Sequence, residues 1–230
     1  MPRTLKLTLL TATLLVLALI AAVAWVGPVA HAATDYPEPS PYPTSWEITF
    51  DYKTPTRIVV NVPGSVSPKA YWYMPYTITN DGEETQNFIP QFEILTSDGK
   101  VHKALNNVPV VVFDTIKSRE RNKLMVAPTK VSGEIRPGVD QARDGVAVWE
   151  EPSKDMDTFK IFVGGLSGEF VELKDDKGNV LKDAKGETLI LRKTLQLTYH
   201  LNGDDVYPGE DVINEGEGRI GKNPKVWVMR

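Results

Sequence analysis

The stretch at residues 70–99 constrains the fold most, because it alternates apolar runs rich in aromatic and β-branched residues with short polar turns. The run 71–79 ends at the turn 80–82, Asn-Asp-Gly, and the run 88–94 is followed by the turn 97–99, Ser-Asp-Gly. Turns of this kind between β-forming runs favour tight hairpins. The sequence therefore predicts that these two runs pair as a β-hairpin, and that the rest of the chain extends the same sheet system.

Two-residue alternation of apolar and polar side chains continues along most of the chain, as in strands with one buried face. In the segment 46–53, for example, Ile48 and Phe50 alternate with polar residues. Segments with strand character are 46–53, 58–62, 71–79, 88–94, 144–150, 157–163, 170–173, 189–201 and 226–229. Because the βαβ rhythm of parallel sheets is absent, the predicted fold class is all-β, an antiparallel β-sandwich.

Some strand positions carry a sharper expectation. Residues 71–79 are apolar on both faces, which predicts a strand that is central or covered. Pro75 cannot donate a ladder hydrogen bond, so a bulge or a locally free edge is expected there. Phe92 and Leu197 are predicted to point inward. Lys193 interrupts the inward face that includes Leu197, which predicts a bulge or a position near the rim.

One segment, 110–123, has helical character. Asp114 is a suitable N-terminal cap, so the pattern predicts one short, exposed helix that begins after it. An excursion of this kind commonly carries the chain from one sheet of a sandwich to the other.

Residues 1–32 have the composition of an export leader and are set aside from the fold. Two basic residues precede an apolar run at 7–26, and a Gly-Pro breaker and the small-x-small sequence Ala30-His31-Ala32 follow it. These features predict a signal peptide cleaved after Ala32. The alternative is an uncleaved anchor helix, since a run of this length can span a bilayer. In either case we expect the remainder to be exported, to the periplasm, the cell surface or the extracellular space.

The mature chain begins with a linker. Four prolines alternate with other residues between 37 and 43, so the segment 33–45 is expected to be extended and Pro-rich. The β-sandwich domain is then expected at 46–230. Its part 170–230 is either further strands of the same domain or a separate sub-unit.

Charge and cysteine content exclude several classes of function. Of the 26 Lys and Arg residues two lie in the leader, which leaves 24 against 30 Asp and Glu, a net charge of −6. This balance argues against a nucleic-acid partner or an anionic membrane surface. The sequence contains no cysteine, which excludes disulfides, thiolate metal sites and thiol nucleophiles.

The order of turns and strands is similar to that of a known class of domain. Residues 76–82, YTITNDG, are followed at 92–99 by FEILTSDG, and residues 135–138, IRPG, precede 145–149, GVAVW. This succession resembles bacterial extracellular immunoglobulin-like domains of uncharacterised function. The resemblance covers about 46–163 and implies an immunoglobulin-like β-sandwich. It concerns the fold, so it assigns no functional residue.

Recognisable catalytic and metal-binding motifs are absent from the sequence. His102 and His200 are isolated and expected to be solvated, and there is no nucleophile elbow, HExxH sequence or phosphate loop. The acidic segment 204–217 has the residue type that calcium prefers, but its spacing matches no EF-hand loop, so we predict a solvated loop without metal. We expect no enzymatic activity and no cofactor.

The aromatic cluster has two interpretations. Exposed Tyr71, Trp72 and Tyr73 would be ligand-binding residues that stack on sugar rings. Buried, they would fill the space between two sheets, as a central Trp commonly does in sandwiches. The core interpretation is favoured, and the same holds for Trp149 and Trp227.

Two hypotheses about function follow. The first is an exported, non-enzymatic β-sandwich protein with a structural or adaptor role in the cell envelope, whose partner is an envelope or extracellular protein or a glycan. The alternative is a carbohydrate or small-ligand binding module that uses exposed Tyr or Trp rings. Coplanar exposed tryptophans on one sheet face would favour the module.

Overall fold

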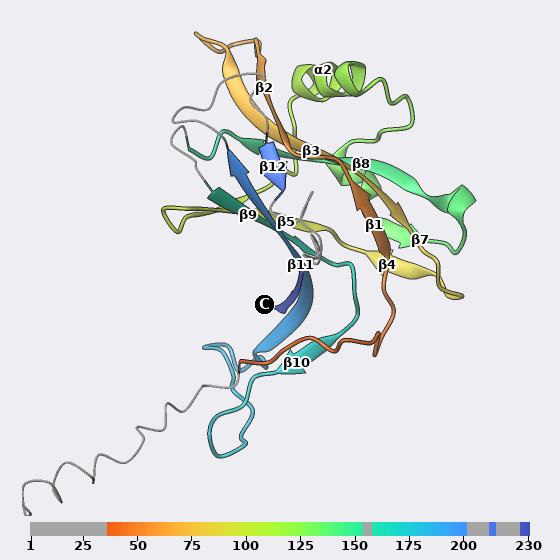
Figure 1. Cartoon of the computed structure of the whole chain (residues 1–230), viewed down its shortest axis with the longest axis vertical. Helices are drawn as coiled ribbons and strands as arrows, with labels where there is room; N and C mark the ends of the chain where they lie inside the picture. Colours follow the sequence, from red (N-terminus) through yellow and green to blue (C-terminus); the bar gives the residue numbers. More distant parts are fainter. Residues whose placement is uncertain (1–35, 154–157, 202–211, 215–225) are drawn as a thin grey trace, which may run out of the picture. The chain divides into compact units, whose positions relative to one another are not determined.

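Strand β3 (Lys69–Thr79) is the centre of the first antiparallel sheet in the computed structural model, which describes residues 36–153, 158–201, 212–214 and 226–230 (Figure 1). Strands β1 (Thr49–Tyr52) and β2 (Thr56–Val60) pair with successive parts of β3, and β8 (Arg143–Glu150) also pairs with it. The predicted leader, 1–32, lies outside the described residues.

Strand β11 (Ile190–Leu201) organises the second antiparallel sheet, in which the order is β10-β11-β9-β5-β6. Strands β12 and β13 also pair with β11, and a small separate sheet joins β4 to β7. The bounds are β4 Gln86–Phe88, β5 Gln91–Thr96, β6 Val101–Lys103, β7 Gly133–Ile135, β9 Thr158–Gly164, β10 Phe170–Glu172, β12 Val212–Asn214 and β13 Val226–Met229. The described part of 170–230 is therefore continuous with the second sheet.

Three short helical segments complete the described part: α2 (Val110–Glu120), α3 (Pro128–Val131) and the 3-10 turn η1 (Val139–Gln141). The chain is thus mostly β with antiparallel sheets and two short α-helices, as the sequence predicts in outline.

The two sheets share a hydrophobic core. One face of β3 contributes Trp72, Met74, Tyr76 and Ile78 to a cluster that also contains residues of β5, β9 and β11. The aromatic contacts Trp72–Phe159 and Tyr76–Phe92, with ring centroids 5.6 and 4.8 Å apart, join the first sheet to the second. Phe92 and Leu197 are buried, as predicted.

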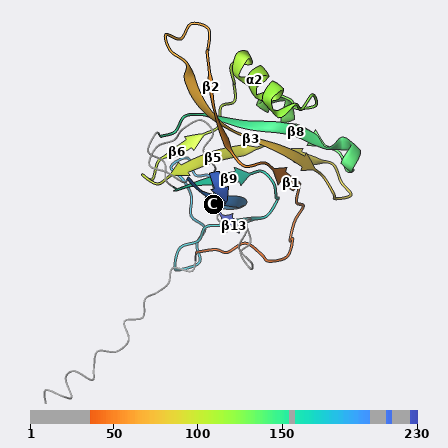
Figure 2. The same cartoon turned by 45° about the horizontal axis from the view of Figure 1, so that its top comes forward.

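The other face of β3 is covered by helix α2. Tyr71 and Tyr73 pack in a second cluster with Val112 and Ile116 of the helix. Figure 2 shows α2 on one side of β3 and β8, with β5 and β9 on the other. This arrangement confirms that the doubly apolar segment 71–79 is covered on both faces.

The turn at Asn80 does not form the predicted hairpin, and that prediction is wrong. β5 pairs with β6 and β9 and not with β3, because β1, β2 and β8 already occupy the edges of β3. The buried Asn80 side chain holds the crossing between sheets by donating hydrogen bonds to the carbonyl oxygens of Glu84 and Ile135, at 2.8 and 2.9 Å. The second turn does join a hairpin, β5–β6, with Gly99 at a φ of 80°.

Helix α2 begins earlier than expected. Its N-cap is Pro109, so Asp114 lies inside the helix and is not its cap. The helix is not simply exposed, because Val112 and Ile116 are fully buried against the first sheet. In chain order it lies between strands of different sheets, β6 of the second sheet and β7 of the small sheet.

Pro75 lies at a position of β3 where one edge of the strand has no ladder partner, as predicted from its missing N–H. The ladder from β3 to β8 continues through the pair Pro75–Val146. On the opposite edge, the pairing with β2 ends at Tyr73 and that with β1 begins at Tyr76, and the Pro75 carbonyl accepts from the Lys53 N–H at 2.9 Å. The missing N–H therefore falls at the junction between β1 and β2.

Two tandem turns follow β10. The segments 174–181 and 182–189 both have the sequence Lys-Asp-x-Lys-Gly-x-x-Leu. In each, the Asp accepts two backbone hydrogen bonds and the Gly has a positive φ. Three leucines join the two turns to the β10–β11 pair through backbone hydrogen bonds. The Leu181 N–H donates to the Leu173 carbonyl, the Leu189 N–H to the Leu181 carbonyl, and the Leu173 N–H to the Leu189 carbonyl, so the three bonds form a closed ring.

Candidate functional site

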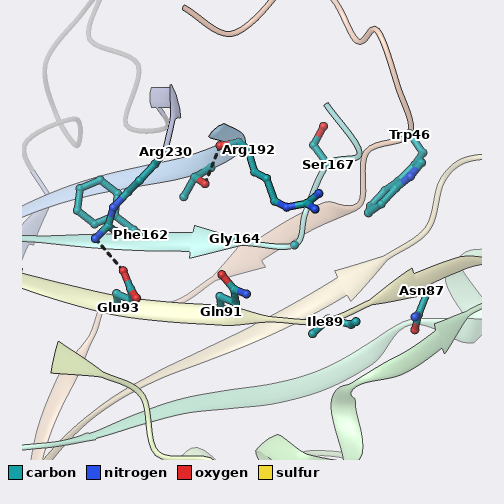
Figure 3. Close-up of a pocket in the computed structure, with 12 residues that line it drawn as sticks. Trp46, Asn87, Ile89, Gln91, Glu93, Phe162, Gly164, Ser167, Arg192 and Arg230 are labelled. Carbon is teal, nitrogen blue, oxygen red and sulfur yellow. Dashed lines mark hydrogen bonds and ion pairs between the residues drawn. The ribbon is translucent and has the colours of Figure 1, made fainter. Parts of the chain in front are cut away.

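A cavity of about 400 Å³ opens on the second sheet, on the face away from the shared core. Figure 3 shows side chains of β5, β9 and β11 converging there with Trp46 and Arg230. Its lining residues are Trp46, Asn87, Ile89, Gln91, Glu93, Phe162, Gly164, Gly165, Ser167, Arg192, Thr194 and Arg230. The volume is in the range of pockets that hold small ligands.

Two glycines at the end of β9 leave the middle of the pocket open. Gly164 is paired with Gln91 of β5 and contributes no side chain. Gly165 has a φ of 86°, and a Cβ atom there would collide with the carbonyl oxygen of Ile89. Glycine is therefore required for the chain to turn this close to β5.

Arg230 lies at one end of the pocket, where a ring and a carboxylate contact its guanidinium. Its guanidinium lies 4.1 Å from the Phe162 ring centroid and forms an ion pair with Glu93 at 2.7 Å. Its backbone exchanges hydrogen bonds with Arg192, in which each N–H donates to the other residue's carbonyl oxygen. The charge of Arg230 is thus largely balanced by Glu93.

Arg192 carries the unbalanced charge. Its side chain extends from β11 past Gly164, toward Ser167 and Trp46 (Figure 3). Among the residues that the structure describes, no ion pair or side-chain hydrogen bond engages its guanidinium, and the residue is exposed. A guanidinium presents several donors in a planar fork that suits carboxylates and phosphates.

Trp46 forms the wall opposite Arg192, and Gly168 places it there. The Gly168 N–H donates to the Trp46 carbonyl at 3.0 Å. A Cβ at position 168 would lie 2.5 Å from the indole nitrogen and would also collide with the Ser45 hydroxyl. Any larger residue at Gly168 must therefore displace the indole.

A buried ion cluster lies beside this wall. The Lys193 ammonium, 3% exposed, pairs with Glu47 at 2.8 Å and with Glu169 at 3.0 Å. It also donates to the Ser40 carbonyl at 3.2 Å, while the Ser40 N–H donates to Glu169 at 2.7 Å. The cluster therefore attaches the predicted linker to the domain at Ser40. On one edge of β11, residues 190–192 pair with β10 and residues 195–200 pair with β9. Lys193 lies between these two pairings, at the interruption of the ladder.

Charge pairing shifts the pKa values of Glu169 and Lys193 in the directions that favour their charged forms. Burial opposes ionisation of Glu169, but the Ser40 N–H and the Lys193 ammonium outweigh it and hold the pKa of this carboxyl below its ordinary value of 4.5. Burial would lower the pKa of Lys193, but Glu47 and Glu169 outweigh it and raise that pKa above 10.5. Glu169 and Lys193 are thus both charged across the neutral pH range.

The aromatic residues proposed as a stacking platform lie in the core. Tyr71, Trp72 and Tyr73 are each 1% exposed. Trp72 packs on Phe159, and the Tyr73 hydroxyl donates to Glu120 at 2.9 Å. They therefore offer no exposed face to a ligand, because α2 and the second sheet cover them.

The remaining tryptophans divide between the core and its margin. Trp149 is fully buried in the core. Trp46 and Trp227 are partly buried against it, and the Lys193 ammonium lies 5.2 Å from the Trp227 ring centroid. Among the described tryptophans no pair of exposed coplanar rings is present.

The two histidines are not brought together. His102 pairs with inward-facing Ile94 of β5, whereas His200 pairs with Thr158 of β9 and alternates with buried Tyr199. They therefore point to opposite faces of the second sheet. Of the acidic segment 204–217, the structure describes only Val212–Asn214, which form strand β12. In the described part of the chain no cluster of His, Asp or Glu could hold a metal ion.

A second cavity, of about 610 Å³, lies between strands β5 and β8. Its lining includes Tyr76, Pro90 and Phe92, and its charged side chains Glu93 and Lys103 pair with each other at 3.9 Å. Because its cation, Lys103, lies beside the carboxylate of Glu93, this cavity offers less to an anionic ligand than the Arg192 pocket.

Sequence reasoning did not find the Arg192 pocket. Its groups come from five parts of the chain, at positions 46, 87–93, 162–167, 192–194 and 230, so no local motif could reveal them. The available signal was the outward position of Arg192 in the alternating segment 189–201.

None of the helices in the described ranges is long and apolar enough to span a membrane.

The sequence matches no protein-family model and no curated protein sequence. Among solved structures, the crystal structure of the yjhA protein from Bacillus subtilis is similar to part of the chain, with 11% sequence identity and a TM-score of 0.34. The similarity covers 54% of this chain and 81% of that one. It is a distant likeness to another protein and assigns no site.

Proposed function

We propose that this protein is an exported, non-enzymatic interaction domain of immunoglobulin-like architecture, which acts as an adaptor in the cell envelope or outside the cell. Its partner, an envelope or extracellular protein or a glycan, would bind in the Arg192 pocket. The observation that carries the proposal is the Arg192 guanidinium, which has no ion-pair partner in the described part of the chain and faces Trp46 across a preformed cavity.

The strand order supports an immunoglobulin-like type. Immunoglobulin constant-type domains place strands A, B, E and D in one sheet and C, F and G in the other. In the first sheet, β1 and β2 together take the place of strand A, β3 that of B and β8 that of E. In the second sheet, β5, β9 and β11 take the places of C, F and G. In chain order α2 comes before β8, where strand D would lie.

The chemistry of the pocket favours binding over catalysis. It presents guanidinium, amide and hydroxyl donors and an indole face, which hold and orient a ligand. Its carboxylate, Glu93, is engaged by Arg230. A small polar ligand is the second candidate, since the cavity is large enough to enclose one.

Export is proposed from the leader and can be tested directly. If the leader is a signal peptide, the protein recovered after secretion should begin at Ala33. Mass spectrometry of that protein measures the loss of residues 1–32. Recovery of the intact chain from a membrane fraction would establish the anchor instead.

Binding through the pocket can be tested with paired variants. Arg192→Glu reverses the unpaired charge, whereas Lys182→Glu makes the same change at an exposed position of the tandem turns. Immobilised wild-type and variant domains are incubated with cell-envelope extract, and the bound material is compared by mass spectrometry. We expect a partner that is retained by the wild type and by Lys182→Glu and lost with Arg192→Glu. Equal retention by both variants would contradict a role for the pocket.

A further inference from the structure

We infer that the Arg192 pocket recognises an acidic sugar, that is, a pyranose ring bearing one carboxylate. This inference rests on the binding function proposed above and specifies its ligand. It follows from the charge balance, the flat wall and the polar lining of the pocket.

The charge balance selects a monoanion. Arg230 and Glu93 are paired at 2.7 Å and together contribute almost no net charge. Of the charged side chains that line the pocket, Arg192 is the one without an ion-pair partner among the described residues, so the pocket offers one cation to a ligand. A dianionic phosphate would bring two negative charges to this one available cation, which is unfavourable where solvent is partly excluded. A carboxylate can accept two parallel hydrogen bonds from one guanidinium.

The wall opposite Arg192 suits a ring with an apolar face. The indole of Trp46 lies close to Gly168 and is packed against the core on one side. Ile89, 59% exposed, provides a further apolar group at the pocket. The axial C–H groups of a pyranose form such an apolar face, whereas an extended acidic peptide has no comparable flat surface.

The remaining lining suits hydroxyl groups. Asn87 and Gln91 each offer an amide donor and an amide acceptor, and Ser167 offers a hydroxyl. Because these groups both donate and accept, they match sugar hydroxyls better than an apolar ligand. Gly164 leaves room between the amides and Arg192, as Figure 3 shows.

The test measures D-glucuronate binding to the mature domain by isothermal titration calorimetry and by tryptophan fluorescence. D-Glucose lacks the carboxylate, glucose 6-phosphate replaces it with a dianion, and N-acetylglutamate carries carboxylates without the ring. We expect D-glucuronate to bind at least about tenfold more tightly than each of the three, as expected for a charge-assisted hydrogen-bonded contact.

Variants locate the binding and separate it from folding. Arg192→Gln should weaken D-glucuronate binding at least about tenfold, whereas Lys182→Gln should leave it unchanged. Trp46→Phe should abolish most of the fluorescence change that D-glucuronate causes. The melting temperature of each variant is measured to establish that it is folded.

Other outcomes would overturn the inference. Equal binding of D-glucose would show that the carboxylate is not recognised, and preference for glucose 6-phosphate would refute the monoanion argument. Equal binding of N-acetylglutamate would refute recognition of the ring. If no probe binds but the envelope partner is still lost with Arg192→Glu, the acidic-sugar inference fails and the proposed interaction function stands.

Discussion

Arg192 and Lys193 are consecutive basic residues of β11, yet they occupy opposite environments. Arg192 is exposed on the outer face, and among the described residues no partner engages its guanidinium. Lys193 is 3% exposed and contacts Glu47, Glu169 and the Ser40 carbonyl. The comparison shows that strand alternation places one basic side chain at the exposed pocket and the next in a buried ion cluster.

The difference between the two regions lies in how their charges are compensated. In the Lys193 cluster the protein itself supplies the carboxylates, so the charge stabilises the attachment of residue 40 to the domain. The carboxylate that lines the Arg192 pocket, Glu93, is paired with Arg230, so among the described residues no carboxylate forms an ion pair with Arg192. A buried ion without its partner is strongly unfavourable, whereas an exposed one remains hydrated.

The largest expected effect comes from Lys193→Met, which removes the ammonium and leaves Glu169 buried. We expect the free energy of unfolding to fall by about 3–5 kcal/mol. Arg192→Met, the matched change one residue earlier, should alter it by less than about 0.5 kcal/mol. Urea unfolding followed by far-UV circular dichroism measures both. Equal losses would show that the two basic residues do not differ in structural role.

The next prediction extends the comparison along β11. Leu197 is fully buried between the sheets, and Phe92 faces the same core. Leu197→Ala and Phe92→Ala should each lower the free energy of unfolding by about 2–5 kcal/mol. Thr198→Ala, on the outward face, should cost less than about 0.5 kcal/mol. A similar cost at Leu197 and Thr198 would contradict the assigned register.

A smaller effect is expected from the acid titration of the Lys193 cluster. Because the folded-state pKa of Glu169 lies below 4.5, its ionised form contributes stability above that pH. The contribution disappears as the pH falls through the folded-state pKa. Glu169→Gln should cost about 1–3 kcal/mol at neutral pH, and this difference from wild type should shrink on acidification.

The matched control for Glu169→Gln is Glu172→Gln, a change at an exposed carboxylate of β10. Chemical unfolding at a series of pH values measures the difference of each variant from wild type. A difference at Glu169 that stays constant from neutral to acidic pH would mean that ionisation of this carboxyl does not stabilise the fold. Lys193 affects stability at alkaline pH. Its charged form stabilises the fold below pH 10.5, and this stabilisation is lost as the pH rises through the elevated folded-state pKa.

Several features could be predicted from the sequence because they depend on local periodicity. The alternation in 189–201 assigned Leu197 and Lys193 to one face, and both are buried there. The doubly apolar segment 71–79 predicted a strand covered on both sides, which α2 and the second sheet provide. The helix near 110–123 was likewise predicted, although its first turn at Val110 was missed because no side-chain cap marks it.

Tertiary structure alone decided which strands pair and which charged side chains are compensated by ion pairs. A turn such as 80–82 reverses the chain in the same way whether the next strand pairs with the previous one or crosses to another sheet. Here both edges of β3 were already occupied, so β5 joined β9. The Arg192 pocket has the same origin, because its groups meet only after β9, β11 and residues 46 and 230 are assembled. Periodicity is a short-range property of the chain, whereas edge occupancy and charge compensation depend on residues that are distant in sequence and meet only in the fold.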